Sequence, residues 1–455
     1  MKKLLLTTVI LAFIACNEEE KITYVILNAS VENNIADNAM VRGNGFELKI
    51  PISETGTFSD TLRISKDGYY QLFVGRERTG IYLEQGATIS ANVNAKEFDE
   101  TIKYEGTLAS ENNYLASKYL HNETSIDYPK MFSNDEATFV SELKNYNTGL
   151  GSLLSESNIT NESFNALEKQ ELTYEYASLL ENYQEYHQYF TKTPGFKASE
   201  SLYDEIKDLK FNDTIAFRNS TGYQDLVNTH YSRLVGDALL ENDKLNRTVT
   251  YLKIVNENLP DGFAKNSLLT QFLRYGLAPD EHLEEAFSIY KSTNPNQGDL
   301  EAITGQYNIL KELTPGKVSP TFDYENHKGG NTSLKDLAGK YVYVDVWATW
   351  CGPCIREIPS LKIVEAEYHD KNIVFVSLSI DAAKDHEKWK SMVTNKELGG
   401  IQLMADKDWK SSFAVEYNIL GIPRFILIDP SGNIVSADAP RPSDTKLREL
   451  LDGLI

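Results

Sequence analysis

The feature that most constrains the fold of this chain is the stretch VYVDVWATWCGPCIREIP, residues 342–359. It begins as an apolar run rich in β-branched residues, which predicts a buried strand over residues 341–347. Two cysteines follow, and the sequence then predicts a helix over residues 353–368, where Pro353 suits an early helical position because its missing N–H is not needed there. A strand that runs into a CxxC and a helix places both sulfur atoms at a helix N-terminus.

This position favours thiolate chemistry, because the free backbone N–H groups and the dipole of a helix stabilise negative charge in its first turn. We expect Cys351 to have a depressed pKa, to be partly exposed and to act as the attacking nucleophile. Cys354, one turn further along, is expected to be more buried and to act as the resolving thiol that closes a Cys351–Cys354 redox disulfide. Gly352 lets a substrate backbone approach the sulfur atoms.

A zinc half-site is the alternative reading of the two cysteines. It would require further ligands, but the chain contains no other cysteine pair, and its seven histidines show no metal-type spacing. We therefore expect neither a metal nor another cofactor.

The third cysteine lies near the N-terminus. Lys2 and Lys3 precede an apolar run over residues 4–14, which is too short to span a bilayer of about 30 Å as a helix and has the layout of a secretory signal. A buried N-terminal helix is the alternative. The run ends in FIAC, residues 13–16, which resembles the lipobox of bacterial lipoproteins and implies lipidation of Cys16. An exported chain would then retain one thiol pair, which favours a redox role.

Length and charge restrict the remaining possibilities. With 455 residues, of which 41% are apolar, the chain is long enough for several domains, each with its own core. The formal net charge of −21 disfavours nucleic acid or an anionic lipid surface as a partner, because both repel an acidic protein.

The sequence predicts a multidomain chain whose regions differ in their pattern of apolar and turn residues. After a signal peptide over residues 1–16, residues 17–109 carry short alternating runs between turn residues, which predict a small antiparallel β domain without site chemistry. Residues 110–313 have apolar residues at spacings of three and four and predict an irregular bundle of about six to eight helices. The turn-rich residues 314–320 predict a linker. Strands and helices then alternate over residues 321–455, as in a mixed sheet with helices on both faces.

In this last region we expect strands over residues 341–347, 373–380, 425–429 and 434–436, and helices over residues 353–368, 383–394, 409–417 and 443–454.

The context of the CxxC resembles a known family. VDVWATWCGPC, with GIPRFILID further along the chain, resembles a thioredoxin fold over residues 320–455. The long insertion before GIPRFILID and the lead-in SPTFDYENHKGGNTSLKDLAGKYV are similar to the TlpA/ResA-like thiol-disulfide oxidoreductases of bacterial envelopes. Many lipoproteins of this family also carry an N-terminal β domain of unknown function and a helical middle region. The resemblance implies an α/β thioredoxin fold for the C-terminal domain.

The resemblance also implies a substrate-binding surface around the cysteines. Ile422-Pro423 corresponds to the cis-proline turn of the family, where an extended substrate strand could pair with a backbone edge. The sequence alone leaves Pro423 free to be trans. Arg424 follows it where threonine is common in the family. The expected substrate-binding residues are Trp350, Gly352, Pro353, Ile422 and Pro423.

Two carboxylates are candidates for moving the proton of Cys354. Asp345 lies in the otherwise apolar strand VYVDVW and matches the buried acid of thioredoxins; without a cationic partner, burial would raise its pKa. Glu357 lies three residues after Cys354 and matches a glutamate of the TlpA/ResA-like branch. The alternatives are a solvent-facing aspartate and a surface glutamate. Pro359 should kink the same helix.

The expected function is that of an envelope thiol-disulfide oxidoreductase. Gly352-Pro353 is the dipeptide of thioredoxin, a reductant with a reduction potential of about −270 mV, whereas DsbA-like oxidants have a potential of about −120 mV. The expected partners are disulfide-containing envelope proteins, with apocytochrome c as one option, a membrane thiol transporter as electron donor, and the membrane itself through the anchor at Cys16. The expected location is the cell envelope, facing the periplasm or the cell surface.

Two other functions stay open at this point. The first is peroxide reduction of the peroxiredoxin type, although a peroxidatic cysteine normally has threonine three residues ahead, where this chain has Ala348 and places Thr349 one residue later. The second is a surface ligand-binding lipoprotein whose redox domain is accessory, in which case a phenotype would survive deletion of residues 321–455.

Overall fold

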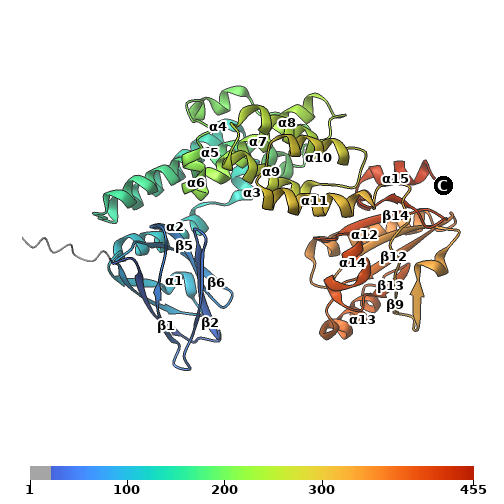
Figure 1. Ribbon diagram of the computed structural model, residues 1–455, viewed down its shortest axis with the longest axis horizontal. Helices are drawn as coiled ribbons and strands as arrows, with labels where there is room; N and C mark the ends of the chain where they lie inside the picture. Colours follow the sequence, from blue (N-terminus) through green and yellow to red (C-terminus); the bar gives the residue numbers. More distant parts are fainter. Residues whose placement is uncertain (1–21) are drawn as a thin grey trace, which may run out of the picture. The chain divides into compact units, whose positions relative to one another are not determined.

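The computed structural model describes residues 22–455, so the predicted signal segment and Cys16 lie outside the described residues (Figure 1). The chain forms two compact units that divide between Lys207 and Asp208. Within residues 22–455, no helix combines the length and the apolar character needed to cross a bilayer.

The first unit begins with eight strands in two four-stranded sheets, ordered β4-β1-β7-β8 and β3-β2-β5-β6. The pairings are antiparallel except for that of β1 with β7, which is parallel. In β1 every second residue is buried, because side chains of a strand alternate between its faces. The predicted antiparallel β domain is confirmed. Its strands are β1 (Val25–Glu32), β2 (Asn38–Gly43), β3 (Phe46–Pro51), β4 (Thr57–Leu62), β5 (Gly68–Val74), β6 (Glu77–Leu83), β7 (Thr88–Asn94) and β8 (Lys103–Gly106).

Helices follow in both units, so the predicted helical region is confirmed but is divided between them. The first unit contains α1 (Phe98–Thr101), α2 (Ala109–Ser125), α3 (Tyr128–Ser133), α4 (Glu136–Glu156), α5 (Glu162–Thr191) and the 3-10 helix η1 (Glu200–Ile206). The second unit contains α6 (Thr214–Asn219), α7 (Thr221–Glu241), α8 (Arg247–Asn258), α9 (Phe263–Gly276), α10 (Leu283–Ser292) and α11 (Gln297–Lys311).

This region holds more helices than expected because several are short and individually capped. Asp127 caps α3 and Asp213 caps α6, and each aspartate accepts hydrogen bonds from backbone N–H groups of the first turn. Helices of six residues are too short to produce a clear apolar period.

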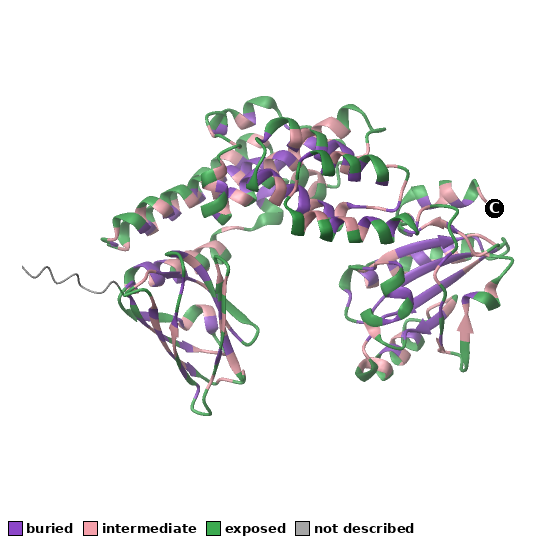
Figure 2. Cartoon of the chain, viewed as in Figure 1, coloured by how far each residue is buried: buried purple, intermediate pink, exposed green. Residues whose placement is uncertain are grey.

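The C-terminal part of the second unit is a seven-stranded mixed sheet, ordered β10-β9-β13-β12-β11-β14-β15. Strands β11, β12 and β13 are parallel, and β14 runs antiparallel to β11. The central strands are buried along their length between helices (Figure 2), which explains their nearly continuous apolar sequence. The strands are β9 (Asp323–Asn326), β10 (Asn331–Ser333), β11 (Tyr341–Trp347), β12 (Ile373–Ser379), β13 (Ile401–Met404), β14 (Arg424–Ile428) and β15 (Ile434–Ser436).

The helices of this part are α12 (Gly352–Glu367), α13 (His386–Asn395), α14 (Ser412–Glu416) and α15 (Thr445–Asp452). Three of the expected helices are shorter than predicted, and short 3-10 turns, η3 (Ala383–Asp385) and η4 (Asp408–Lys410), precede α13 and α14. Sequence reasoning missed β13, because its four residues follow two glycines and are too few to show a period.

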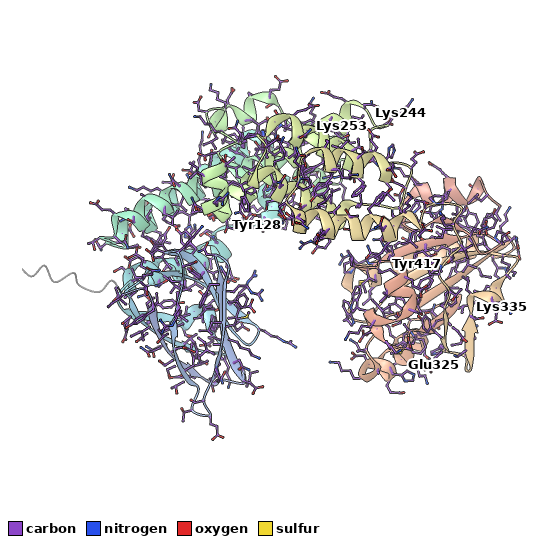
Figure 3. All side chains as sticks on the ribbon, viewed as in Figure 1. Tyr128, Lys244, Lys253, Glu325, Lys335 and Tyr417 are labelled. Atoms are coloured by element: carbon purple, nitrogen blue, oxygen red, sulfur yellow. A yellow bond between two sulfur atoms is a disulfide. The ribbon has the colours of Figure 1, made fainter. Side chains whose placement is uncertain are left out.

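The predicted linker is docked on the sheet. Gly316 N–H donates to the carbonyl oxygen of Ile434 at 2.8 Å, and Val318 forms an isolated β-bridge with Asn433. The hydroxyl of Ser319 shares a hydrogen bond of 2.7 Å with that of Tyr417. Tyr417, which is labelled in Figure 3, directly follows α14. Residues 314–320 therefore continue the edge of the sheet next to β15.

Candidate active site

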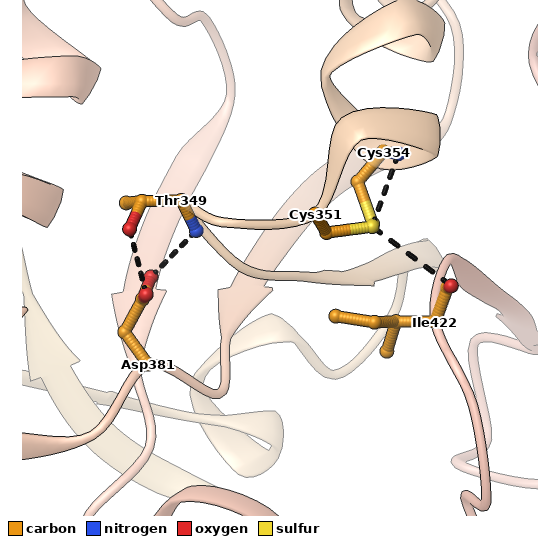
Figure 4. The surroundings of a disulfide bond; sticks show 5 residues. All are labelled: Thr349, Cys351, Cys354, Asp381 and Ile422. Carbon is orange, nitrogen blue, oxygen red and sulfur yellow. Dashed lines mark hydrogen bonds between the residues drawn. A yellow bond between two sulfur atoms is a disulfide. The ribbon is translucent and has the colours of Figure 1, made fainter. Parts of the chain in front are cut away.

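The two cysteines form a disulfide at the start of α12, with a Cα–Cα distance of 5.3 Å. Cys351 is the N-cap residue of the helix, and the backbone N–H of Cys354 points at the Cys351 sulfur with an N–Sγ distance of 3.1 Å (Figure 4). Cys351 is 4% exposed and Cys354 3% exposed. Both cysteines are therefore buried in the disulfide form, and the expectation that Cys351 is partly exposed is wrong for this form.

A proline turn lies opposite the sulfur atoms. The Ile422-Pro423 peptide bond is cis, and the carbonyl oxygen of Ile422 lies 3.8 Å from the Cys351 sulfur (Figure 4). Both residues are half-buried. The backbone edge that the family resemblance implied is therefore placed beside the disulfide.

The other expected substrate-binding residues form an exposed rim. Gly352 and Pro353 are exposed in the first turn of α12, and Trp350 is 52% exposed. The ring of Trp350 lies 6.3 Å, centroid to centroid, from that of Trp409, which is also exposed. Sequence reasoning missed Trp409, because only the structure shows that this tryptophan is exposed. Large apolar side chains at the surface often mark contact sites.

Asp345 lies in the middle of β11 and is 7% exposed, so the solvent-facing alternative is wrong. Burial, together with the nearby carboxylates of Glu357 and Glu365, raises the pKa of Asp345 to about 8. No hydrogen bond to this carboxylate is found within residues 22–455, and both charged neighbours are acidic. Asp345 is therefore able to change its protonation state near neutral pH.

Glu357 is also buried, at 9% exposed, so the surface-glutamate alternative is wrong. Its carboxylate accepts hydrogen bonds from the backbone N–H of Ser443 at 3.0 Å and from the Ser443 hydroxyl at 2.9 Å. Ser443 immediately precedes Asp444, the N-cap of α15. Glu357 thus ties α12 to the start of α15, and it influences Asp345 through its charge.

Residues 315–437 match the model of the AhpC/TSA family. A thiol-disulfide oxidoreductase ResA from Bacillus cereus is 32% identical over 125 residues, which cover 28% of this chain and 69% of ResA. The chain belongs to the TlpA/ResA-like thioredoxin-fold proteins. It is a thiol-disulfide oxidoreductase, and the resemblance read from the CxxC context is confirmed.

Other relatives of this TlpA/ResA-like chain match the same region. The thioredoxin-like protein YneN of Bacillus subtilis (strain 168) is 27% identical over 140 residues, covering 31% of this chain and 80% of YneN. The thioredoxin domain of a thiol-disulfide oxidoreductase from Bacteroides vulgatus is 31% identical, covers 31% of this chain and 99% of the solved chain, and has a TM-score of 0.29. A thiol-disulfide oxidoreductase from Bacteroides fragilis is 30% identical, with coverage of 30% and 99% and a TM-score of 0.27.

The loop before the cysteines of this oxidoreductase is held by a second buried acid that sequence reasoning missed. Asp381 is fully buried just beyond β12 and accepts hydrogen bonds from Thr349, through its backbone N–H at 2.9 Å and its hydroxyl at 2.7 Å (Figure 4). The hydroxyl of Ser379 donates to the same carboxylate at 2.7 Å. Asp381 therefore fixes the residues that lead into Cys351. The only sequence signal is an aspartate at the end of an apolar strand.

A cleft of about 460 Å³ adjoins the cis-proline turn within the second unit. Ile422, Pro423 and Arg424 line it from the oxidoreductase domain, and Arg274 and Tyr275 line it from the end of α9. The Arg424 guanidinium forms an ion pair of 2.8 Å with Asp438, another residue of the cleft wall. The position where this sequence departs from the common threonine of the family is thus part of a polar cleft beside the disulfide.

Sequence reasoning also missed Glu365, which lies eight residues after Glu357 on the same face of α12 and is half-buried. Burial raises the pKa of Glu365 to about 7, and the nearby Lys362 ammonium opposes that shift. The helical spacing of four and eight residues could have placed Glu357, Leu361 and Glu365 on one buried face.

Within residues 22–455, no group of three or more histidine, cysteine, aspartate or glutamate side chains is arranged to hold a metal ion.

Proposed function

We propose that this chain reduces disulfides of envelope proteins by cycling Cys351 and Cys354 between the dithiol and the disulfide. The observation that carries the proposal is the position of the disulfide, with Cys351 as the N-cap of α12 and a backbone N–H aimed at its sulfur. Backbone N–H groups at a helix start favour a thiolate over a thiol, and the thiolate is the nucleophile in disulfide exchange.

The reaction proceeds in two exchange steps. The Cys351 thiolate attacks one sulfur of the substrate disulfide, forms a mixed disulfide and releases the first substrate thiolate. Cys354 then loses its proton to the Asp345 carboxylate, and its thiolate attacks the Cys351 sulfur. The bond to the substrate breaks, the second substrate sulfur leaves as a thiolate, and the Cys351–Cys354 disulfide closes. Both substrate thiolates take protons from solvent. One substrate disulfide is reduced to two thiols while two enzyme thiols are oxidised.

The cis-proline turn positions the substrate for the first step. A polypeptide in extended conformation pairs with the backbone beside Ile422 and Pro423, because the carbonyl of Ile422 lies next to the attacking sulfur. Trp350, Gly352 and Pro353 form the exposed side of the same surface. The three arginines that line the neighbouring cleft, Arg274, Arg424 and Arg441, favour substrates with acidic or polar residues near the disulfide.

The direction of electron flow and the location rest on the sequence. The Gly352-Pro353 dipeptide favours a reductant, and an exported reductant requires a membrane thiol transporter to recharge it. The segment up to Cys16 supports export and lipid anchoring, which would place the enzyme in the envelope. Envelope disulfides, including those of apocytochrome c, are the substrates we propose.

Peroxide reduction is the second candidate, favoured by the match to the AhpC/TSA family over residues 315–437. The geometry around Thr349 opposes it. Its hydroxyl donates to Asp381 and the residue is 3% exposed, so it is not placed to contact a peroxide at Cys351. Peroxide consumption at a rate comparable to that of a peroxiredoxin would reverse this assignment.

The decisive experiment is substrate trapping with the full chain. In the variant Cys354→Ser, Cys351 should accumulate mixed disulfides with envelope proteins, because the resolving thiol is missing. The variant Cys351→Ser, which retains Cys354, is the matched control and should trap none. Adducts on the control and none on Cys354→Ser would invert the two roles, and absence of adducts on both would refute protein disulfides as substrates.

A further inference from the structure

A small cavity lies behind the active site, between β11, β12, β13 and α12. It has a volume of about 10 Å³ and is lined by Asp345, Trp347, Ser377, Glu365 and Gln402, among others. A volume of about 10–15 Å³ is what one water molecule needs, provided that polar partners are present. The cavity is therefore large enough for a single water molecule next to the Asp345 carboxylate.

Two polar atoms on the cavity wall require such a partner. The indole Nε1 of Trp347 and the amide Oε1 of Gln402 are buried and have no hydrogen-bond partner among the described residues. Trp347 is 2% exposed and Gln402 5% exposed, so bulk water does not reach them. One is a donor and the other an acceptor. A water molecule can accept from the indole N–H and donate to the amide oxygen, which are the bonds that these buried groups lack.

Glu365 connects this cavity with the surface. It lines the cavity and also an open groove of about 470 Å³, together with Lys362 and Gly399. The groove is otherwise lined by residues such as His369, Phe375 and Ile401. One carboxylate thus borders both the cavity beside Asp345 and the open groove.

Two glycines make room for the Glu365 carboxylate. A Cβ atom on Gly399 would lie 2.3 Å from one Glu365 oxygen, and a Cβ on Gly400 would lie 2.9 Å from the other. Gly400 also requires its glycine because φ is +57° and the added Cβ would meet the carbonyl oxygen of Phe375 at 2.6 Å. The loop before β13 is therefore shaped around this side chain.

We propose that Glu365 is a positioning residue that passes the Asp345 proton to solvent through one water molecule held in this cavity. The inference rests on the proposed function, in which Asp345 receives the proton of the Cys354 thiol. The proton moves from Asp345 to the cavity water, the water gives a proton to the Glu365 carboxylate, and Glu365 releases it to a solvent base in the groove. Asp345 and Glu365 are then ionised again, and no electrons are transferred in these steps.

The charged groups around this route agree with it. Asp345 faces Glu357 and Glu365 on α12, and both carboxylates disfavour its ionised form. Glu365 faces Lys362 on its own helix, and Glu397 lines the groove from the segment after α13. The raised pKa of Glu365, about 7, matches a group that gains and loses a proton near neutral pH.

The test follows the two exchange steps separately. The reduced full chain, with Cys16→Ser in every variant so that only two thiols react, is mixed with 5,5′-dithiobis(2-nitrobenzoate). The first equivalent of coloured thiolate reports attack by Cys351, and the second reports attack by Cys354. With a pKa of about 8, the Asp345 carboxyl is mostly protonated near pH 7 and must lose its proton through Glu365 before it can accept that of Cys354. Glu365→Gln should therefore leave the first phase unchanged and slow the second by about five- to tenfold, a fraction of what general acid–base groups contribute. In this variant, the rate of the second phase should also no longer increase as the pH rises through 7.

Two further variants separate proton transfer from damage to the fold. Gly399→Ala keeps the carboxylate but pushes it aside, and because only a side-chain end stands in the way, the fold should tolerate it; the second phase should again be slowed. Glu367→Gln, on the same helix but exposed, should match the unaltered chain. With Asp345→Asn already present, Glu365→Gln should have no additional effect.

Unchanged rate and pH profile in Glu365→Gln would overturn the inference, as would equal slowing with and without Asp345. Failure of the unaltered chain to release a second equivalent would instead refute the proposed dithiol cycle.

Discussion

Glu168 in the first unit is 1% exposed and Asp345 in the second is 7% exposed, but the two buried carboxylates have different surroundings. Glu168 lies on α5 and accepts hydrogen bonds from the hydroxyl of Tyr69 on β5, the hydroxyl of Tyr114 on α2 and the ammonium of Lys118 on α2. The last two bonds are 2.9 Å long. Three elements of the first unit therefore converge on one charged group.

Glu168 also shifts the pKa values of the side chains that donate hydrogen bonds to it. Burial and the adjacent carboxylate raise the pKa of Tyr69 and of Tyr114, so both keep the proton that they donate. Burial lowers the pKa of Lys118, but the carboxylates of Glu168 and Glu175 more than offset this and raise it overall. The two tyrosine hydroxyls and the Lys118 ammonium therefore remain hydrogen-bond donors at neutral pH.

Asp345 has none of these partners, and its charged neighbours are the carboxylates of Glu357 and Glu365. The same type of group is thus a structural tie in one unit and a titrating group in the other. The difference lies in the donors that surround the carboxylate, because burial alone is common to both. This contrast makes opposite predictions for removing each charge.

The largest effect is expected for Glu168→Ala. The change leaves Glu175 as the remaining carboxylate partner of Lys118 and deprives two tyrosine hydroxyls of their acceptor. With three hydrogen bonds to a charged group lost, the free energy of unfolding should fall by about 3–5 kcal/mol. All four tryptophans of the chain lie in the second unit. In urea, the transition seen by far-ultraviolet circular dichroism should therefore shift, whereas that seen by tryptophan fluorescence should not. The exposed neighbour Gln170→Ala is the control. A decrease in the free energy of unfolding of less than about 1 kcal/mol would show that the cluster does not stabilise the first unit appreciably.

Asp345→Asn should change the free energy of unfolding in the opposite direction and stabilise the chain at neutral pH. The folded pKa of about 8 lies above the ordinary value of 3.8, so the folded chain binds a proton that the unfolded chain releases between these values. The wild-type chain therefore loses stability as pH rises from 3.8 to about 8, and the variant lacks this loss. Relative to the wild type, the variant should gain about 4 kcal/mol of stability between pH 4 and pH 7. Because the amide also lacks partners, the variant should be less stable by about 1–2 kcal/mol near pH 4 and more stable by about 2–3 kcal/mol at pH 7. Tryptophan fluorescence in urea at each pH measures the difference. A gain independent of pH would contradict the assignment.

Asp381→Ala tests whether hydrogen-bond donors or the surrounding domain determine how a buried carboxylate affects stability. Asp381 lies in the same domain as Asp345 but accepts three hydrogen bonds, two from Thr349 and one from Ser379. The variant should therefore behave like Glu168→Ala and lose about 2 kcal/mol, since it leaves buried donors unpaired. The tryptophan transition should shift to lower urea while the first unit is unaffected. Stabilisation here would mean that any buried acid of this domain is unfavourable.

The amino-acid sequence predicted the parts of the site that depend on local pattern. The strand β11 begins and ends at the predicted residues 341–347, because an apolar run and a following CxxC define both ends. The single charge in that run, together with the resemblance to thioredoxins, identified Asp345 as a candidate buried acid, and the structure places it in the core. These features depend on a few neighbouring residues.

The sequence did not predict features that depend on contacts between distant segments. Thr349 meets Asp381 across 32 residues, and Glu357 meets Ser443 across 86. The space around Glu365 is created by glycines in another loop. The short strand β13 carries no period of its own and is defined by pairing with β12 and β9. Such contacts are set by packing of the whole domain, which periodicity does not encode.

The smallest expected effect comes from Tyr69→Phe, which removes one of the three donors to Glu168 and leaves the ring contacts with Tyr82 and Phe164 in place. Because Tyr114 and Lys118 still solvate the carboxylate, the loss should be about 1–1.5 kcal/mol, the value of one hydrogen bond to a charged group. In the Glu168→Ala background, Tyr69→Phe should change the free energy of unfolding by almost nothing, because the Tyr69 hydroxyl no longer has a carboxylate acceptor. A loss as large as that of Glu168→Ala would mean that the cluster works only when complete, and equal losses in both backgrounds would mean that Tyr69 acts through its ring.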